Sequence, residues 1–186
     1  MDIIVAITGS TGVIYGIRLL EILKETEHNT HLIISFWGEK NIEIETNYTV
    51  SQVKSLASYN YSYSNLGAAI SSGSHPNDSM VIVPCSMKTL SSIAHGYSEN
   101  LISRAADVTL KERKKLVIVP RETPLTTIHL ENMLTITRAG GVILPPMPAF
   151  YYMPKTIDDI INHTVGKVLD QLKVSNSLFR RWEGLA

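Results

Sequence analysis

The sequence predicts an α/β fold in which helices cover both faces of a doubly wound parallel sheet of about six strands. The apolar runs that predict strands are continuous rather than alternating, which is typical of strands buried on both faces. Segments with helical spacing lie between these runs, so right-handed βαβ crossovers are expected to join the strands. No repeat or linker marks a second domain, and we expect one domain over residues 1–174.

The expected elements follow in order along the chain. Apolar runs predict five strands, at 3–7, 32–35, 80–83, 116–119 and 142–144. A tyrosine-rich run at 59–63 is a weaker sixth candidate. Helical spacing predicts six helices: 12–24, 51–57, 89–95, 101–113, 126–139 and 157–172. A tail follows at 175–186, and its Phe179 and Trp182 are expected to dock at a subunit interface.

The composition excludes several classes of protein. Lys and Arg together number 17, as do Asp and Glu, so the chain lacks the basic excess of a typical nucleic-acid binder. The single cysteine, Cys85, excludes an intramolecular disulfide. The N-terminus has no basic signal-peptide region, and no apolar run approaches the roughly 20 residues that span a bilayer. We therefore expect a cytoplasmic protein without a membrane segment.

Five loops leave the carboxyl ends of the predicted strands, where ligands bind to sheets of this kind. All are rich in hydroxyl groups, proline or charge: 8–11, 35–37, 84–89, 120–124 and 145–152. The last loop is apolar and aromatic, so it is suited to wall an isoprenoid or a flat ring, or to cover a subunit contact. This convergence predicts one binding site at the carboxyl edge of the sheet.

The first loop places Gly9, Ser10 and Thr11 at the start of a helix, where backbone N–H groups and the helix dipole favour an anion. No Lys follows the turn as in a P-loop, and the glycines do not have dinucleotide-binding spacing. Ser35, rather than an acidic residue, ends the second strand. A monophosphate therefore fits better than a pyrophosphate. The alternative is that Ser10 or Thr11 only caps the helix.

The third and fourth loops offer further polar groups. In "PCSMKTL", Ser86 and Thr89 stand at a second helix start and Lys88 adds positive charge, although a simple cap with Lys88 in solvent is the alternative. In "PRETP", Arg121 can bind an anion or a ring edge, and Glu122 can act as a general acid or base. An exposed ion pair of little consequence is the alternative for these two.

Two further groups of charged residues bear on function. Arg104 and Lys111 lie two turns apart on one predicted helix face and could clamp a phosphate, although a solvated basic face is the alternative. The pair Asp158 and Asp159 lacks a second acidic cluster, and the six histidines form no i, i+4 pair. No metal site is therefore expected.

Several segments together resemble one known family. They include "ITGSTGVIYGIRLL", "AAISSGS", "PCSMKTL", "LKERKKLVIVPRETPL", "HLENML" and "GGVILPPMPAFYYMP", and they occur in the same order over nearly the whole chain. With them the sequence resembles the flavin prenyltransferases of the UbiX/Pad1 family. The resemblance implies a Rossmann-like three-layer α/β/α sandwich that binds FMN. It also implies transfer of a dimethylallyl group from dimethylallyl phosphate to N5 and C6 of reduced FMN, without a metal.

The resemblance also implies partners. Members of the family assemble as homododecamers, with sites where subunits meet, and a UbiD-type decarboxylase uses the prenylated FMN. Two other functions remain open: an FMN-dependent decarboxylase of peptidyl cysteine or phosphopantothenoylcysteine, and an FMN-carrying decarboxylase subunit. The cysteine decarboxylases resemble one another around "PASANT", where this chain has "PCSMKT".

The resemblance implies a role for particular residues. The FMN site would comprise Gly9, Ser10, Thr11, Ser35, Ser86, Met87, Lys88, Thr89 and Arg121. The phosphate of dimethylallyl phosphate would be held by Arg104, Lys111, Tyr151 and Lys167. Catalysis would involve Glu122, Glu45 and Ser10, with Trp182 in a tail that closes over the site. Two places depart from the family pattern, Lys167, where Arg is frequent, and residues 75–79, which could face the prenyl site.

Overall fold

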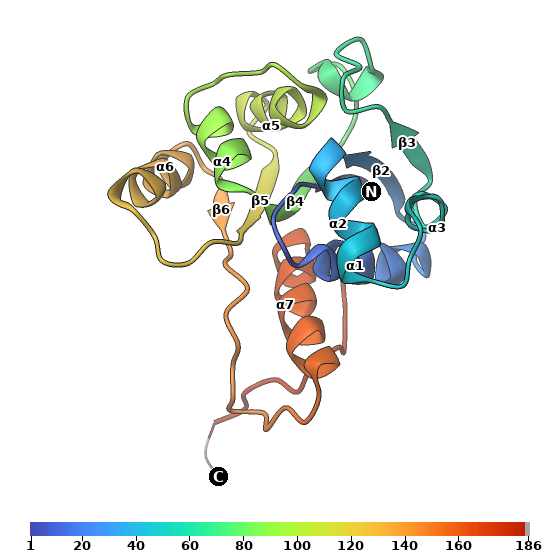
Figure 1. Ribbon diagram of the computed structural model, residues 1–186, viewed down its shortest axis with the longest axis vertical. Coiled ribbons are helices and arrows are strands. Elements are labelled where there is room, and N and C mark those ends of the chain that lie inside the picture. The colour runs from blue at the N-terminus through green and yellow to red at the C-terminus, as the bar shows by residue number, and fades with distance from the viewer. Residues whose placement is uncertain (185–186) are drawn as a thin grey trace.

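Six parallel strands form one sheet in the computed structural model, which describes residues 1–184 (Figure 1). The strands are β1 (Asp2–Ile7), β2 (Asn29–Ile34), β3 (Tyr59–Tyr61), β4 (Ser79–Cys85), β5 (Lys115–Pro120) and β6 (Val142–Ile143). Their order is β3-β2-β1-β4-β5-β6. The chain therefore moves outward from β1 in one direction and returns to place β4 on its other side. This reversal opens a crevice at the carboxyl ends of β1 and β4.

Helices cover both faces of the sheet. They are α1 (Val13–Lys24), α2 (Phe36–Glu45), α3 (Val50–Lys54), α4 (Met87–Ala94), α5 (Leu101–Lys111), α6 (Thr127–Arg138) and α7 (Ile157–Leu172), with a short 3₁₀ turn η1 (Ala69–Ser71). The predicted α/β/α sandwich is confirmed, and so are all six predicted helices and six predicted strands. No helix within residues 1–184 is long and apolar enough to cross a membrane.

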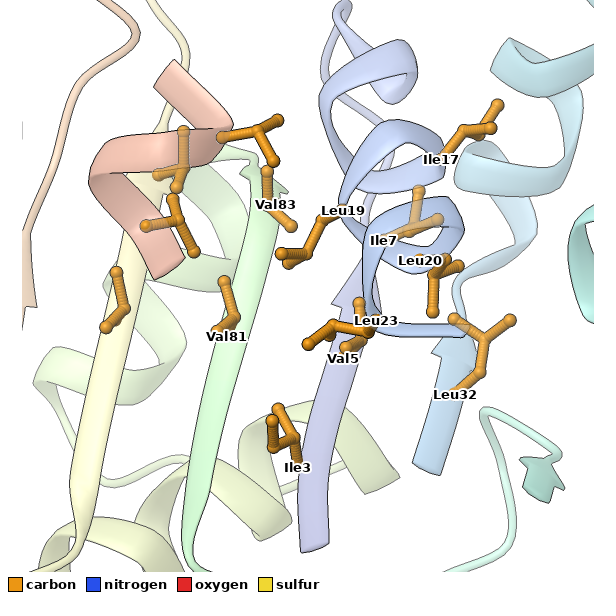
Figure 2. Close-up of a cluster of buried hydrophobic side chains, with 14 of the residues drawn as sticks. Ile3, Val5, Ile7, Ile17, Leu19, Leu20, Leu23, Leu32, Val81 and Val83 are labelled. Carbon is orange, nitrogen blue, oxygen red and sulfur yellow. The ribbon is translucent and has the colours of Figure 1, made fainter. Parts of the chain in front are cut away.

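Alternate residues of β1 fill two separate cores, as expected for a strand buried on both faces. Ile3, Val5 and Ile7 pack with α1 and α7 on one face (Figure 2). Ile4 and Ala6 pack with α4, α5 and α6 on the other. The α5 and α7 helices therefore lie on opposite faces of the sheet, which matters for the site below.

Helix α2 is the one long element that the sequence pattern does not indicate. Its sequence, FWGEKNIEIE, contains a glycine and buries only Gly38 and Ile42, so it has no apolar stripe. Ser35, expected at the end of the second strand, instead caps this helix: its Oγ accepts a hydrogen bond from the Gly38 N–H at 3.1 Å.

The loop 145–156, the start of α7 and the tail 175–184 project together beyond the sheet, and we call them the arm (Figure 1). The tail returns along α7, where the Phe179 ring packs so closely on Gly166 that a Cβ there would overlap it. Arg181 forms a bidentate ion pair with Asp170 at 2.9 and 2.7 Å. Docking of the tail at a subunit interface stays a prediction, and residues 185–186 lie outside the described part.

Candidate functional site

The carboxyl ends of β1 and β4 are tied together by Thr8. Its hydroxyl donates a hydrogen bond to the Pro84 carbonyl at 2.8 Å and accepts one from the Ser86 N–H at 2.8 Å. The Arg121 N–H, at the end of β5, donates to the Cys85 carbonyl at 3.1 Å. Three of the predicted loops therefore meet at one edge of the sheet, as the sequence predicts.

Replacing Thr8 with Val is expected to lower the free energy of unfolding by about 1–3 kcal/mol, because Thr8 is 1% exposed, and loss of its hydroxyl removes the acceptor of the Ser86 N–H and one of the two hydrogen bonds to the Pro84 carbonyl. Urea unfolding measures the effect. Thr135→Val on the exposed surface of α6 is the matched control and is expected to change stability by less than about 0.5 kcal/mol. Equal effects of the two substitutions would contradict the role of Thr8.

The turn after β1 carries a polar atom without a partner. The Ser10 Oγ is buried and has no hydrogen-bond partner among the described residues. Neighbouring Gly9 lies so close to Trp37, at the start of α2, that a Cβ at Gly9 would overlap the Trp37 Cβ. Buried hydroxyls are normally hydrogen-bonded, so Ser10 is suited to bind an oxygen or nitrogen of a ligand.

The N-terminus of α1 holds an anion that the chain itself supplies. The Glu45 Oε2, from the last residue of α2, accepts hydrogen bonds from the N–H groups of Gly12 at 2.8 Å and Val13 at 3.3 Å. Gly12 is the N-cap, with φ of 97°, and makes no side-chain cap. The alternative that Ser10 or Thr11 caps this helix is therefore wrong. A phosphate at this turn would contact the 9–11 segment rather than the amides that Glu45 occupies.

The turn after β4 is a capped helix start. Ser86 Oγ accepts a hydrogen bond from the Thr89 N–H at 3.4 Å and lies 3.1 Å from the Thr89 hydroxyl. Lys88 extends into solvent and pairs with Glu99 at 3.3 Å. The capping interpretation is confirmed for Ser86, while ligand binding by residues 86–89 stays a prediction.

A pocket of about 760 Å³ opens beside this junction. Its polar lining includes Thr11, Glu45, Arg121 and Glu122, and Tyr15 also lines it. The wall is formed by Ile14, Leu125, Pro145, Pro146, Met147, Pro148, Ile157 and Ile161. Burial raises the pKa of Tyr15, and the positive charge of Arg121 opposes that shift. The pocket can therefore hold a group with an apolar body and an anionic end.

Two predicted phosphate ligands lie on α5, outside this pocket. The Arg104 Nε donates to the Ser71 carbonyl at 3.1 Å, and its guanidinium pairs with Asp107 at 2.9 Å. Lys111, two turns later, pairs with Glu112. A Cβ on Gly73 would lie 2.9 Å from the Lys111 Nζ. These two cations therefore flank the serine-rich segment that follows η1.

The other two predicted phosphate ligands belong to the opposite side of the sheet. Lys167 lies on α7 and is 3.8 Å from Asp170. Tyr151 lies on the arm, where its hydroxyl is 3.5 Å from His163 Nε2 and its ring is 6.0 Å from that of Trp182. One chain does not bring all four ligands together, because α5 and α7 cover opposite faces.

Aromatic rings surround His163 on the arm. The Tyr152 ring stacks on it at 5.2 Å and the Phe179 ring meets it at 4.7 Å. Burial lowers the pKa of His163, and the charge of Lys167 acts in the same direction. Trp182 is 60% exposed beside them, so the arm presents an aromatic surface with no cover in a single chain.

Two residues of the site, Thr8 and Tyr15, lie in the segment ITGSTGVIYGIRLL but are given no role by the sequence analysis. The polar Thr8 at the end of an apolar run was a usable signal, and Tyr15 lies one turn into a helix that starts at the site. Within residues 1–184, no three His, Cys, Asp or Glu side chains lie close enough to hold a metal ion.

Comparison with known proteins identifies the family. The family model described as Flavoprotein matches residues 1–169. The flavin prenyltransferase LpdB of Lactiplantibacillus plantarum is 53% identical over 183 residues, covering 98% of each chain. The chain belongs to the UbiX-like flavin prenyltransferase family. The resemblance noted in the sequence is confirmed, and members of this family are enzymes.

Two solved structures of relatives superpose on this flavin prenyltransferase. AnUbiX (PadA1), in complex with FMN and dimethylallyl pyrophosphate, has a TM-score of 0.98 and is 49% identical, with 100% of this chain and 98% of that chain covered. A dodecameric FMN-dependent UbiX-like decarboxylase from Escherichia coli O157:H7 has a TM-score of 0.97 at 50% identity, with 99% and 100% covered. The predicted fold is confirmed at this level of similarity.

Proposed function

We propose that this flavin prenyltransferase joins a dimethylallyl group, taken from dimethylallyl phosphate, to reduced FMN. The observations that carry the proposal are the unpartnered Ser10 hydroxyl in the turn after β1, and a pocket in which neighbouring Thr11 and Arg121 line one part and apolar residues line the rest. A flavin needs a hydrogen-bonding edge, and a prenyl chain needs an apolar wall. The described residues provide both at one place.

The FMN site is proposed at the shared carboxyl edge. Gly9, Ser10 and Thr11 from the first turn, Ser35 from the start of α2, and Arg121 from the end of β5 surround the junction. The turn at 86–89 (Ser86, Met87, Lys88 and Thr89) adds hydroxyls and N–H groups at the start of α4. Ser10 Oγ is the atom of this set that most needs a ligand, because it is buried and unpaired.

The substrate phosphate is proposed to lie between two copies of the chain. Arg104 and Lys111 of one copy would approach it from α5, and Tyr151 and Lys167 of another from the arm and α7. Lys167 stands where Arg is frequent in the family. Its ammonium group cannot bind phosphate through two parallel hydrogen bonds as a guanidinium does, but its charge still attracts phosphate. We propose a homododecamer, in keeping with the exposed aromatic arm and with a net charge of +0, which does not oppose association.

The chemistry follows from these groups. Reduced FMN supplies the nucleophilic N5 and C6 atoms. Arg104 and Lys111 stabilise the phosphate that departs when the allylic C–O bond breaks, so a monophosphate donor needs no magnesium. The apolar wall of the pocket excludes water from the carbocation. Attachment to N5 would release the N5 proton, and ring closure at C6 would add a proton to the alkene of the attached group and remove one from C6. Glu122 would accept the C6 proton, and Glu45, fixed on the amides of Gly12 and Val13, lines the same pocket.

Incubation of the protein with reduced FMN and dimethylallyl phosphate in EDTA tests this function. Mass spectrometry is expected to detect FMN carrying one added dimethylallyl group. A parallel reaction contains oxidised FMN and a peptide that ends in cysteine, and it is expected to show no decarboxylation. If no prenylated flavin forms with either the monophosphate or the diphosphate donor, the proposal is overturned. Decarboxylation of the cysteine peptide would favour the cysteine decarboxylase alternative.

The product is proposed to serve a UbiD-type decarboxylase, because a modified flavin is a cofactor that another enzyme uses. Adding the reaction mixture to such a decarboxylase without its cofactor is expected to restore decarboxylation. If only the prenyltransferase protein itself, and not its filtered product, restores activity, the chain acts as an accessory subunit instead.

A further inference from the structure

Residues 71–78 (SSGSHPND) connect η1 to β4, and we call this segment the strap. It lies against the two cations of α5. Arg104 donates to the Ser71 carbonyl at 3.1 Å, and Gly73 packs on the side chains of Lys111 and Glu112. The position of the strap therefore bears directly on how these cations are oriented.

The far end of the strap is fixed at the amino edge of the sheet. The Asp78 N–H donates to the Asp2 carbonyl at 2.8 Å, and the Asp2 N–H donates to the Asp78 carboxylate at 2.7 Å. Lys114 donates to the His75 carbonyl at 3.1 Å and to Asn77 Oδ1 at 3.3 Å. Within one chain, residues 75–79 lie at the opposite edge of the sheet from the 760 Å³ pocket, and that they face the prenyl site stays a prediction.

The His75 ring is the central contact of the strap. It meets the His31 ring edge-on at 5.2 Å. His31 is 3% exposed and is held between the Asp2 carboxylate at 3.1 Å and the Tyr61 hydroxyl at 3.0 Å. The His75 Nδ1 is buried without a hydrogen-bond partner in the described residues, and so is the Asn77 Nδ2. A proton added at Nδ1 would therefore have no partner among the described residues.

The titratable groups near His75 and its neighbour His31 come from several elements. Asp2 from β1, His31 from β2 and Lys114 from the turn before β5 act on His75 itself. Tyr59 and Tyr61 from β3 contact His31, and Asp78 of the strap accepts from the Asp2 N–H. Burial lowers the pKa of His75 from 6.5, His31 adds to the shift, Asp2 opposes it, and Lys114 adds to it. The docked strap therefore favours the neutral ring.

We propose that His75 is a positioning residue, whose neutral ring docks the strap on His31 and so holds Arg104 and Lys111 in the orientation that binds the substrate phosphate. This inference rests on the proposed function. Because the folded-state pKa of His75 is depressed, its contribution is complete above the unfolded value of 6.5 and is lost as the pH falls below it. Acidification then weakens binding of dimethylallyl phosphate without touching the FMN site.

Steady-state kinetics of the wild-type protein and His75→Phe test this inference between about pH 5.5 and 8. The ratio of their KM values for dimethylallyl phosphate removes the titration of the substrate itself. The KM of the wild type divided by that of His75→Phe is expected to be near one at high pH. It is expected to rise about threefold at low pH, because the wild type then binds dimethylallyl phosphate more weakly. The kcat and the FMN dissociation constant are expected to be equal. His75→Gln, which also stays neutral, is the second variant if Phe is not tolerated.

His95→Phe is the matched control, because His95 is exposed at the end of α4 and its ring contacts the Ser91 carbonyl of its own helix. Its KM for dimethylallyl phosphate is expected to equal that of the wild type at every pH. A KM ratio that does not change with pH would overturn the inference, as would a change confined to kcat or to FMN affinity. If the wild type makes no prenylated flavin at all, the proposed function fails instead.

Amide hydrogen exchange of residues 71–78 tests the docking without any turnover. Below about pH 6.5, exchange in the wild type is expected to be faster than in His75→Phe after correction for intrinsic rates. Equal exchange in the two proteins would overturn the docking role of His75, whatever the enzyme does.

Discussion

Arg104→Ala and Lys167→Ala are each expected to lower kcat/KM for dimethylallyl phosphate by about 100-fold, because each removes a charge from a bound phosphate. An oligomer that contains both variants is nevertheless expected to regain activity. Arg104 lies on α5 and Lys167 on α7, which cover opposite faces of the sheet. A phosphate bound to both residues must therefore lie between two chains.

Co-expression of the two variants with different affinity tags allows mixed oligomers to be isolated. Random assembly leaves about a quarter of the sites with an intact Arg104 and an intact Lys167, so about a quarter of wild-type activity is expected. In the control, Arg104→Ala is mixed with the double variant, and no site can be intact. Mixed oligomers as inactive as this control would show that the two residues do not share a site between chains.

Gly16→Val is expected to lower the free energy of unfolding by about 3 kcal/mol or more. Gly16 lies where α1 crosses the sheet, and a Cβ there would overlap the Val83 carbonyl oxygen and lie 2.9 Å from the Ile7 Cγ1. Both neighbours belong to strands in the middle of the sheet, so they cannot move aside cheaply. The start of α1 would shift and carry the 9–11 turn with it, so FMN binding is expected to weaken as well.

Urea unfolding and FMN titration measure these two effects. Gly67→Ala is the matched control, because its nearest neighbour would be Asn65 Oδ1 at 3.5 Å, an ordinary contact. That variant is expected to stay within about 0.5 kcal/mol of the wild type and to bind FMN normally. Similar losses for the two glycines would mean that the close crossing of α1 does not set the stability.

The strands and most helices were predictable because the spacing of their apolar residues reflects which faces are buried. Strand β1 is buried on both faces, so its run of apolar residues is unbroken. Helix α2 was not predictable in this way, since it buries only Gly38 and Ile42 and its exposed residues include Phe36 and Trp37. Its surface lacks the periodicity from which helices are inferred.

The site was predictable only in part. Ser10 and Arg121 follow predicted strands, and the rule that ligands bind at carboxyl ends therefore selects them. Glu45 lies at the end of the unpredicted helix α2 and reaches the site by its contact with Gly12, so it was selected by the family resemblance and not by its place after a strand. Lys167 and Arg104 are separated by the sheet, and the prediction that they bind one phosphate rests on family resemblance rather than on the geometry of one chain.

A crystal structure of this protein with FMN and dimethylallyl phosphate tests the central claim most directly. The flavin is expected to lie at the junction of β1, β4 and β5, with a polar atom within hydrogen-bond distance of Ser10 Oγ and Arg121 close to it. The phosphate of the second ligand is expected to contact Arg104. A flavin bound elsewhere, such as in the separate groove of about 380 Å³ beside β3, would contradict this account.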